Sequence, residues 1–222
     1  MTVDKDHTDD AALALAQTLC ARLCHDLGGP AGMAASMLET AAAELVPAGG
    51  GQGRPDGPVL DEALAIARDG AVAVRARLRV WRAACGGDTG PLDAAALAAL
   101  VTAMLVDTRV TFDCAMPPDT ILPPAAVQLA LVATMLGVEA LPRGGIVHLA
   151  GGPDEILVLP QGVGARWPAG LSAAVAGMAV ELEPRRVLPA FLAALAAAEG
   201  WRLGIGLGPS TMPGPLMITW PD

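Results

Sequence analysis

Aromatic residues and cysteines are scarce in this sequence, which argues against two common ways of stabilising a domain. Aromatics make up 3% of the residues and tyrosine is absent. This favours closely packed helices with small side chains over an aromatic-rich sandwich. The four cysteines are too few and too scattered for a disulfide framework. The apolar fraction is nevertheless 53%, and a chain of 222 residues is long enough to bury a core.

Basic residues and long apolar runs are scarce as well. The chain has 14 lysines and arginines against 23 acidic residues, so nucleic acid is not expected as its main partner. The longest apolar run, residues 124–142, contains Gln128 and Glu139 and falls short of a membrane span. Residues 1–10 are acidic and polar, unlike a signal peptide. We therefore expect a soluble, cytoplasmic protein that binds neither membrane nor nucleic acid.

Two long stretches of the sequence have helical periodicity. In residues 9–46 small apolar side chains recur at every seventh position, a coiled-coil-like pattern. In residues 59–85 apolar side chains follow one another at alternating spacings of four and three. Residues 47–58 between them are rich in glycine and proline and predict a flexible connection. The pattern predicts a helical hairpin.

A lone hairpin of this kind cannot bury a seam that runs along both of its sides. The simplest solution is a homodimer in which two hairpins form a four-helix bundle around a two-fold axis. The turn-rich stretch 86–91 follows the hairpin. We therefore predict two domains, a dimerising hairpin over residues 1–86 and a second domain over residues 87–222.

The second domain mixes helices and strands. Helices are predicted over 92–105, 123–141 and 187–201, and strands over 109–116, 144–151, 155–161 and 216–220. The order lacks the regular strand–helix–strand alternation of a doubly wound sheet. We expect a small α/β sandwich with one mixed sheet covered by helices on one face, and hence an α+β protein overall.

The sequence LCARLCHDLGGPAG, residues 19–32, places a histidine and an acid inside the first helix, followed by two glycines and a proline. The helical angle puts His25 roughly opposite the seam, where a neutral imidazole is a competent nucleophile. The glycines cost about 1 kcal/mol each and the proline about 3 kcal/mol in a helix interior. Such a sacrifice predicts a functional surface where another protein approaches, although an isolated histidine on a helix is usually an ordinary surface residue.

The stretch LCHDLGGPAG has the His–acid–Leu–two residues–Pro pattern of the phosphoacceptor helix in dimeric histidine kinases. LCARLCHDL and the small residues after it resemble the ChpT-type histidine phosphotransferases, and the order of parts extends the resemblance over nearly the whole chain. The resemblance implies that His25 receives a phosphoryl group from a receiver domain of a hybrid histidine kinase and passes it to response regulators. Asp26 would orient the ring or hold a proton. Magnesium would belong to the partner receiver domain.

A phosphate carrier needs a docking surface. The second helix carries five arginines and has no acid between residues 71 and 87, so a basic stripe beside His25 would steer acidic receiver domains. A solvated helix face with favourable charges near its C-terminus explains the arginines equally well. The residues expected to contact receivers are Arg22, Gly28, Gly29, Met33, Val74, Arg75, Arg77, Leu78 and Arg79.

The second domain lacks the residues with which a histidine kinase binds ATP. Leu136 stands at the position expected for a magnesium-binding asparagine, and Pro160 stands where an adenine-binding aspartate is expected, although Gly162 and Gly164 remain. The GIGLG stretch at 204–208 is more simply a turn than a phosphate-binding lid. Without an amide or carboxylate anchor we expect no ATP use and no cofactor in this chain.

Other interpretations of the sequence are weaker or stay open. Cys20, Cys24 and His25 do not suggest a metal or haem site, because the cysteines share the seam face and are separated by three residues rather than two. His148 has no evident partner in the sequence. Two alternative functions remain: a dimeric scaffold or anti-kinase that carries no phosphate, and an ATP-dependent histidine kinase.

Overall fold

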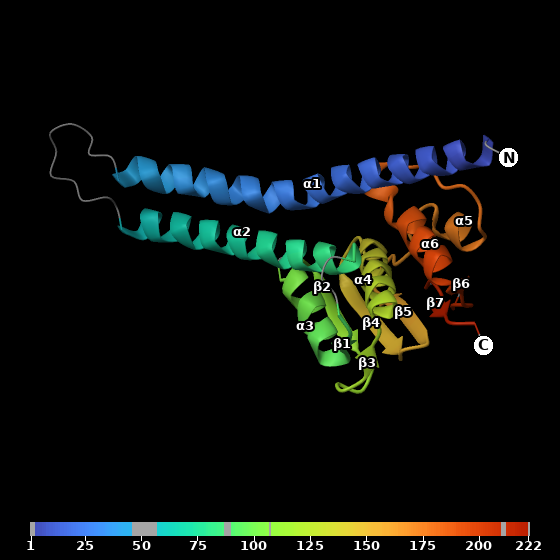
Figure 1. Cartoon of the computed structure of the whole chain (residues 1–222). Coiled ribbons are helices and arrows are strands. Elements are labelled where there is room, and N and C mark those ends of the chain that lie inside the picture. Colours follow the sequence, from blue (N-terminus) through green and yellow to red (C-terminus); the bar gives the residue numbers. More distant parts are fainter. Residues whose placement is uncertain (1–2, 46–56, 87–89, 107, 210–211, 222) are drawn as a thin grey trace, which may run out of the picture.

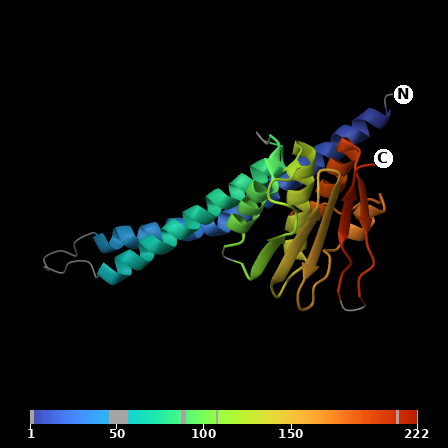
Figure 2. The same ribbon diagram turned by 90° about the horizontal axis from the view of Figure 1, so that it is seen from below.

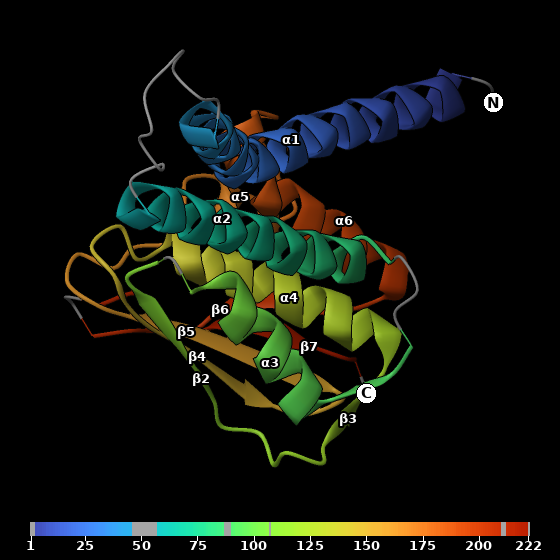
Figure 3. The same ribbon diagram turned by 90° about the vertical axis from the view of Figure 1, so that its left-hand side faces the viewer.

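The computed structural model describes residues 3–45, 57–86, 90–106, 108–209 and 212–221. Two long helices, α1 (Val3–Leu45) and α2 (Gly57–Ala84), run side by side as a hairpin (Figure 1). The predicted hairpin is therefore confirmed, while most of the connection predicted over residues 47–58 lies outside the described residues. The two halves of α1 differ in direction (Figure 3). The helix continues through Pro30, and a proline inside a helix commonly bends it.

Small side chains allow α1 and α2 to approach closely. Ala63, Ala67 and Gly70 are buried at helical spacing on α2. A Cβ atom at Gly70 would lie 2.9 Å from the carbonyl oxygen of Pro30 and 3.1 Å from Cβ of Ala34. The close packing of small residues that the composition favours thus occurs where α2 passes Pro30.

The second domain contains the remaining elements. They are β1 (Leu92–Asp93), α3 (Ala94–Met104), β2 (Val110–Cys114), β3 (Ile121–Leu122), α4 (Pro124–Glu139), β4 (Gly145–Gly151), β5 (Glu155–Gln161), α5 (Leu171–Val175), the 3₁₀-helix η1 (Pro184–Arg186), α6 (Leu188–Glu199), β6 (Arg202–Ile205) and β7 (Leu216–Thr219). Five strands form a sheet in the order β2-β4-β5-β7-β6. Only the β2–β4 pair is parallel, so the sheet is mixed, as predicted.

Local sequence signals explain where the helices of this domain begin and end. The Asp93 side chain accepts a hydrogen bond from the Ala96 amide at 2.6 Å and caps α3. Pro124 opens α4, where a missing N–H costs little. Gly200 ends α6 in the left-handed conformation, with φ of 76°.

The molecule has three layers, with α3, α4 and α6 between the hairpin and the sheet (Figures 2 and 3). Because α4 packs against α2 on one side and the sheet on the other, it is buried nearly all round. This position accounts for the long apolar run at 124–142. No helix in the described ranges is long and apolar enough to cross a membrane. The predicted sandwich with helices on one face is confirmed.

The hydrophobic core crosses the predicted domain boundary after residue 86. Val80, Trp81 and Ala84 at the end of α2 are buried in one cluster with the side chains of α3, α4 and the sheet. On α1, Leu15 and Leu19 pack against the same cluster. The hairpin is thus anchored on the second domain at one end, while its other end projects beyond it (Figure 1).

Several short elements were not predicted. The two-residue strands β1 and β3, the short α5 and η1, and β6 escaped the periodicity analysis, and the interpretation of residues 204–208 as a plain turn missed the end of β6. His148 also has partners that the sequence did not reveal. Its Nδ1 lies 2.9 Å from Asp113 Oδ2 and its Nε2 lies 2.9 Å from Gln161 Oε1, across neighbouring strands.

Candidate functional site

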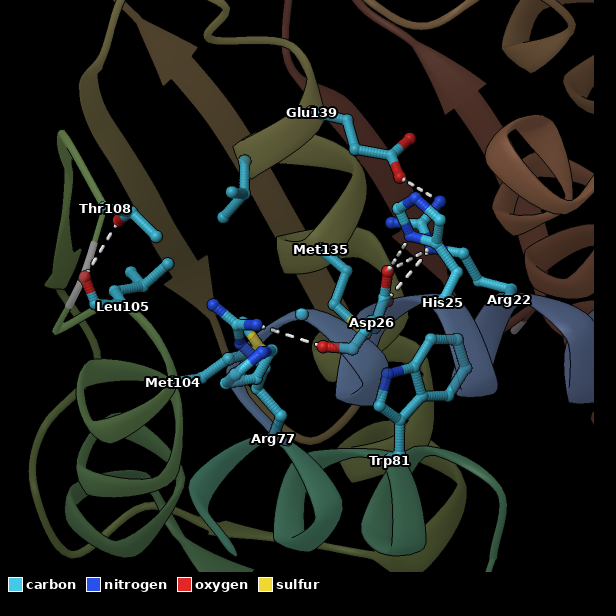
Figure 4. Close-up of a pocket in the computed structure, with 13 residues that line it drawn as sticks. Arg22, His25, Asp26, Arg77, Trp81, Met104, Leu105, Thr108, Met135 and Glu139 are labelled. Atoms are coloured by element: carbon cyan, nitrogen blue, oxygen red, sulfur yellow. Dashed lines mark hydrogen bonds and ion pairs between the residues drawn. The ribbon is translucent and has the colours of Figure 1, made fainter. Parts of the chain in front are cut away.

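His25 lies on α1 beside the second domain, and its side chain is 55% exposed. Its Nδ1 lies 3.3 Å from Oδ1 of Asp26, the next residue (Figure 4). Nδ1 therefore faces a carboxylate of the same helix. The Asp26 carboxylate thus contacts the edge of the His25 ring at Nδ1.

Asp26 is itself held by an arginine one turn earlier on α1. Arg22 Nε donates to both carboxylate oxygens of Asp26 at 2.9 Å, and Arg22 Nη1 lies 2.7 Å from Oε1 of Glu139. Glu139 is the last residue of α4. One guanidinium therefore joins the acid beside His25 to the second domain, and we refer to Arg22, Asp26 and Glu139 as the acid clamp.

Burial and charge act against each other in the acid clamp. Burial by itself lowers the pKa of Arg22, but the attraction of Glu139 and Asp26 outweighs it and the pKa is raised overall. Burial raises the pKa of Glu139, and the nearby Arg22 charge offsets only part of this effect. Arg22 therefore stays charged at neutral pH, and Glu139 accepts a proton more readily than an ordinary glutamate does.

A second arginine reaches the same turn of α1 from α2. Arg77 Nη1 donates to the main-chain carbonyl oxygen of Asp26 at 3.0 Å. Asp26 is thus bound by arginines at both its side chain and its main chain (Figure 4).

His25 lines three cavities, and one of them, beside η1, is also lined by Ala21, Glu183, Pro184 and Arg185. The remaining two differ in character. One, of about 370 Å³, lies between the hairpin and the second domain, and Trp81, Met104 and Met135 form much of its apolar wall (Figure 4). The other is more open, about 670 Å³, and its charged lining consists of Arg22, Glu139 and three further arginines, Arg166, Arg185 and Arg186. We call these three the distal arginines. The imidazole therefore stands between an apolar hollow and a basic one.

The predicted docking residues do not all lie beside His25. Gly28 and Gly29 are exposed, and no atom lies within 4 Å of where their Cβ atoms would be. Within this chain, packing does not require glycine at either position. Met33 is also exposed, at 53%.

On α2, only Arg77 of the predicted docking residues lines a cavity that contains His25. Val74 is half-buried and Leu78 is exposed. Arg75 and Arg79 line a separate groove between α2 and α3. Arg75 and Arg79 thus lie away from the cavities at His25, and the arginines beside the histidine are Arg22, Arg77 and the distal arginines. Sequence reasoning missed the distal arginines because they are about 140 to 160 residues from His25 in the chain, and only the fold brings them there.

The positions compared with a kinase nucleotide site are buried in apolar surroundings. Leu136 is fully buried and Pro160 is buried on the inner face of β5. A Cβ atom at Gly162 would lie 2.5 Å from the carbonyl oxygen of Gly144, so close backbone packing explains this glycine. Among the residues that the structure describes, no cluster of three or more His, Cys, Asp or Glu is suited to hold a metal ion.

Comparison with solved structures finds chains with a similar fold. A structure described as a bacterial phosphotransferase aligns at a TM-score of 0.70 and 25% identity, over 93% of this chain and 95% of its own. The cytoplasmic segment of histidine kinase QseC aligns at a TM-score of 0.38 and 13% identity, over 71% of this chain and 94% of its own. The Acinetobacter baumannii histidine kinase AdeS aligns at 0.39 and 12%, over 88% and 96%. The two kinase alignments are too loose to carry an argument.

Comparison with curated proteins gives no match. The sequence model of the family described as histidine phosphotransferase C-terminal domain matches residues 94–209, which are more than half of the chain and include α3, α4, α6 and the strands β2 to β6. This chain therefore belongs to the histidine phosphotransferase family.

Proposed function

We propose that this protein relays a phosphoryl group through His25, from the receiver-domain aspartate of a hybrid histidine kinase to response regulators, and does so without ATP. The observation that carries the proposal is the exposed imidazole whose Nδ1 lies 3.3 Å from the clamped carboxylate of Asp26. With Nδ1 turned toward the helix, Nε2 is the nitrogen left to meet a partner. A cytoplasmic location and the ChpT-type relay belong to the same proposal.

In the proposed transfer the only bond formed to this chain is at a ring nitrogen of His25. The lone pair of His25 Nε2 attacks the phosphorus of the partner's aspartyl phosphate. As the N–P bond forms, the bond from phosphorus to the aspartate oxygen breaks, and its electron pair leaves with the carboxylate. The proton on Nδ1 stays on the ring, and the Asp26 carboxylate balances the positive charge that the ring gains. Onward transfer to a second receiver reverses these steps.

The acid clamp explains why Asp26 is suited to this role. A free carboxylate beside the ring would rotate among several rotamers, whereas both oxygens of Asp26 are bound by Arg22. Arg22 is held in turn by Glu139 at 2.7 Å. A fixed acceptor fixes the ring orientation, and orientation is the main contribution a phosphocarrier makes to an in-line transfer. In this proposal the magnesium ion comes with the receiver domain.

The distal arginines support an acidic partner at this site. Together with Arg22 they outnumber Glu139, the acid that also lines the hollow containing His25, and a surface with an excess of one charge steers a partner of the opposite charge. A receiver domain that carries acidic residues around its phosphorylated aspartate matches this hollow. The uncovered glycines at 28 and 29 leave room for its backbone on the same helix as the histidine.

Exposed apolar residues on the hairpin support a homodimer. They are Leu13, Leu38, Leu45, Val59, Leu64, Ile66, Val72 and Leu78, and their exposed fractions lie between 37% and 57% apart from Leu45 at 60%. A four-helix bundle would cover exposed apolar side chains on both helices of the hairpin. We propose that two hairpins associate in this way.

We propose that the protein does not use ATP because of the residues at the positions where a histidine kinase binds the nucleotide. A buried leucine and a buried proline at 136 and 160 supply neither a magnesium ligand nor an acceptor for an adenine amino group. A scaffold that carries no phosphate is the competing function, since the same hollow could hold a receiver without reaction.

The test is transfer from a receiver domain that carries a radiolabelled aspartyl phosphate. The proposal predicts an acid-labile label on the wild type and none on His25→Ala. His148→Ala is the matched control, because His148 is bound to Asp113 and Gln161 on the sheet and its loss should leave labelling intact. A scaffold would bind the receiver and stay unlabelled, and a kinase would be labelled by ATP alone. Either result would overturn the proposal.

A further inference from the structure

The geometry points to Arg77 as a positioning residue for phosphotransfer: it binds the main-chain carbonyl that Pro30 leaves free and so fixes the turn of α1 that carries His25 and Asp26. This inference rests on the proposed function of His25. It assigns Arg77 a role inside the chain, in place of the receiver contact that the sequence suggested.

Pro30 creates the free carbonyl. In an α-helix the amide of residue 30 would donate to the carbonyl of residue 26. Proline has no N–H, and its ring pushes against the carbonyl four residues earlier. Because α1 continues through Pro30, the carbonyl oxygen of Asp26 loses its helical donor in the turn that holds the phosphoacceptor.

Arg77 replaces this donor from the neighbouring helix. Its Nη1 lies 3.0 Å from the Asp26 carbonyl oxygen, and its side chain is half-buried between the helices. A charged donor makes a stronger hydrogen bond than a neutral one. Two turns earlier on α2, Gly70 brings the helices together against Pro30 itself. α2 therefore supports the bend of α1 at two points, one steric and one by hydrogen bonding.

The two arginines hold different parts of Asp26. Arg22 fixes its carboxylate and Arg77 fixes its backbone. The carboxylate sets the orientation of the His25 ring, while the backbone sets the position of the whole turn. Without Arg77 the Asp26 carbonyl has neither the helical donor that Pro30 removes nor the arginine that replaces it. The His25 ring then keeps its contact with the Asp26 carboxylate but loses a fixed position relative to the second domain.

The test separates positioning from docking by kinetics. Arg77→Met keeps most of the side-chain volume and removes the donor. We expect its saturating rate of phosphotransfer from a phosphorylated receiver to fall about 10-fold to 100-fold, with the half-saturating receiver concentration changed less than about twofold. Arg77→Lys keeps a charged donor and should recover part of the rate. Arg202→Met, an exposed arginine on the distant edge strand β6, is the matched control and should leave both parameters unchanged.

A second variant tests the route through Pro30. Pro30→Ala restores the amide that donates to the Asp26 carbonyl, so adding Arg77→Met to it should reduce the saturating rate less than about threefold relative to Pro30→Ala alone. An equal loss in both backgrounds, or a loss confined to the half-saturating concentration, would overturn the inference and make Arg77 a docking residue. Failure of the proposed function is distinguishable, because the wild type itself would then remain unlabelled.

Discussion

Three glycines in the interiors of α1 and α2 give a prediction with an internal control. Replacing glycine by alanine in a helix interior stabilises it by about 1 kcal/mol through backbone entropy. At Gly28 and Gly29 nothing lies within 4 Å of the new methyl group, so each change should raise the free energy of unfolding by about this amount. At Gly70 the methyl would lie 2.9 Å from the Pro30 carbonyl oxygen. Overpacking of this kind costs about 1–3 kcal/mol.

The balance at Gly70 is therefore a loss of about 0–2 kcal/mol, and Gly28→Ala should exceed Gly70→Ala in stability by about 1–3 kcal/mol. Urea unfolding at one protein concentration measures this, since association with a second copy would shift the midpoint. If Gly28 and Gly29 keep room for a receiver, their alanine variants should also transfer phosphate more slowly although they are more stable. The reasoning is refuted if Gly70→Ala stabilises as much as Gly28→Ala, or if the stabilised variants transfer at the wild-type rate.

Three further predictions concern charge and association. Burial raises the pKa of Glu139, and a raised acid pKa favours the folded state in which Glu139 is protonated. The stability of the wild type relative to Glu139→Gln should therefore decline as pH rises from the ordinary glutamate value of 4.5 toward 7. Urea midpoints of both proteins across this range test the prediction, and a relative gain in wild-type stability with pH would contradict it. Arg185→Glu with Arg186→Glu should slow transfer about tenfold at low salt and flatten its salt dependence, more than Arg75→Glu with Arg79→Glu, because only the former pair lines the hollow at His25; equal effects in stopped-flow transfer assays would argue against the distal arginines. Leu64→Glu should convert a dimer to monomers in sedimentation experiments, whereas Leu207→Glu, at a fully exposed residue after β6, should not. A wild-type protein that sediments as a monomer would contradict the proposed four-helix bundle.

The regular elements were predictable because their residues carry a local signal. The alternation in EILVLPQ places alternate side chains on opposite faces, and β5 covers these seven residues. Proline marked the start of α4 for a similarly local reason, whereas the helix predicted over 187–201 runs past Gly200, at which α6 ends. The short elements were missed because a two-residue strand such as β1 exists only through its pairing with β3, and no local pattern encodes that partner.

The site was only partly predictable. His25, Asp26 and the consequence of Pro30 for the Asp26 carbonyl can be derived from three positions within one helix. Arg77, which donates the hydrogen bond to that carbonyl, lies 51 positions away in the chain. Glu139 and the distal arginines depend on how the second domain packs against α1. Sequence reasoning therefore found Arg22 and Arg77, which line cavities with His25, but it also assigned a docking role to Arg75 and Arg79, which line a separate groove, and it missed the distal arginines.

The most direct test of the account is to determine which nitrogen of which histidine carries phosphorus. Correlation NMR between phosphorus and nitrogen-labelled histidine, recorded on protein phosphorylated by a receiver domain, identifies the bonded atom. Because Nδ1 of His25 faces Asp26 at 3.3 Å, the account predicts one N–P bond, at Nε2 of His25. A phosphoryl group on Nδ1 of His25, on another residue, or on none would contradict it.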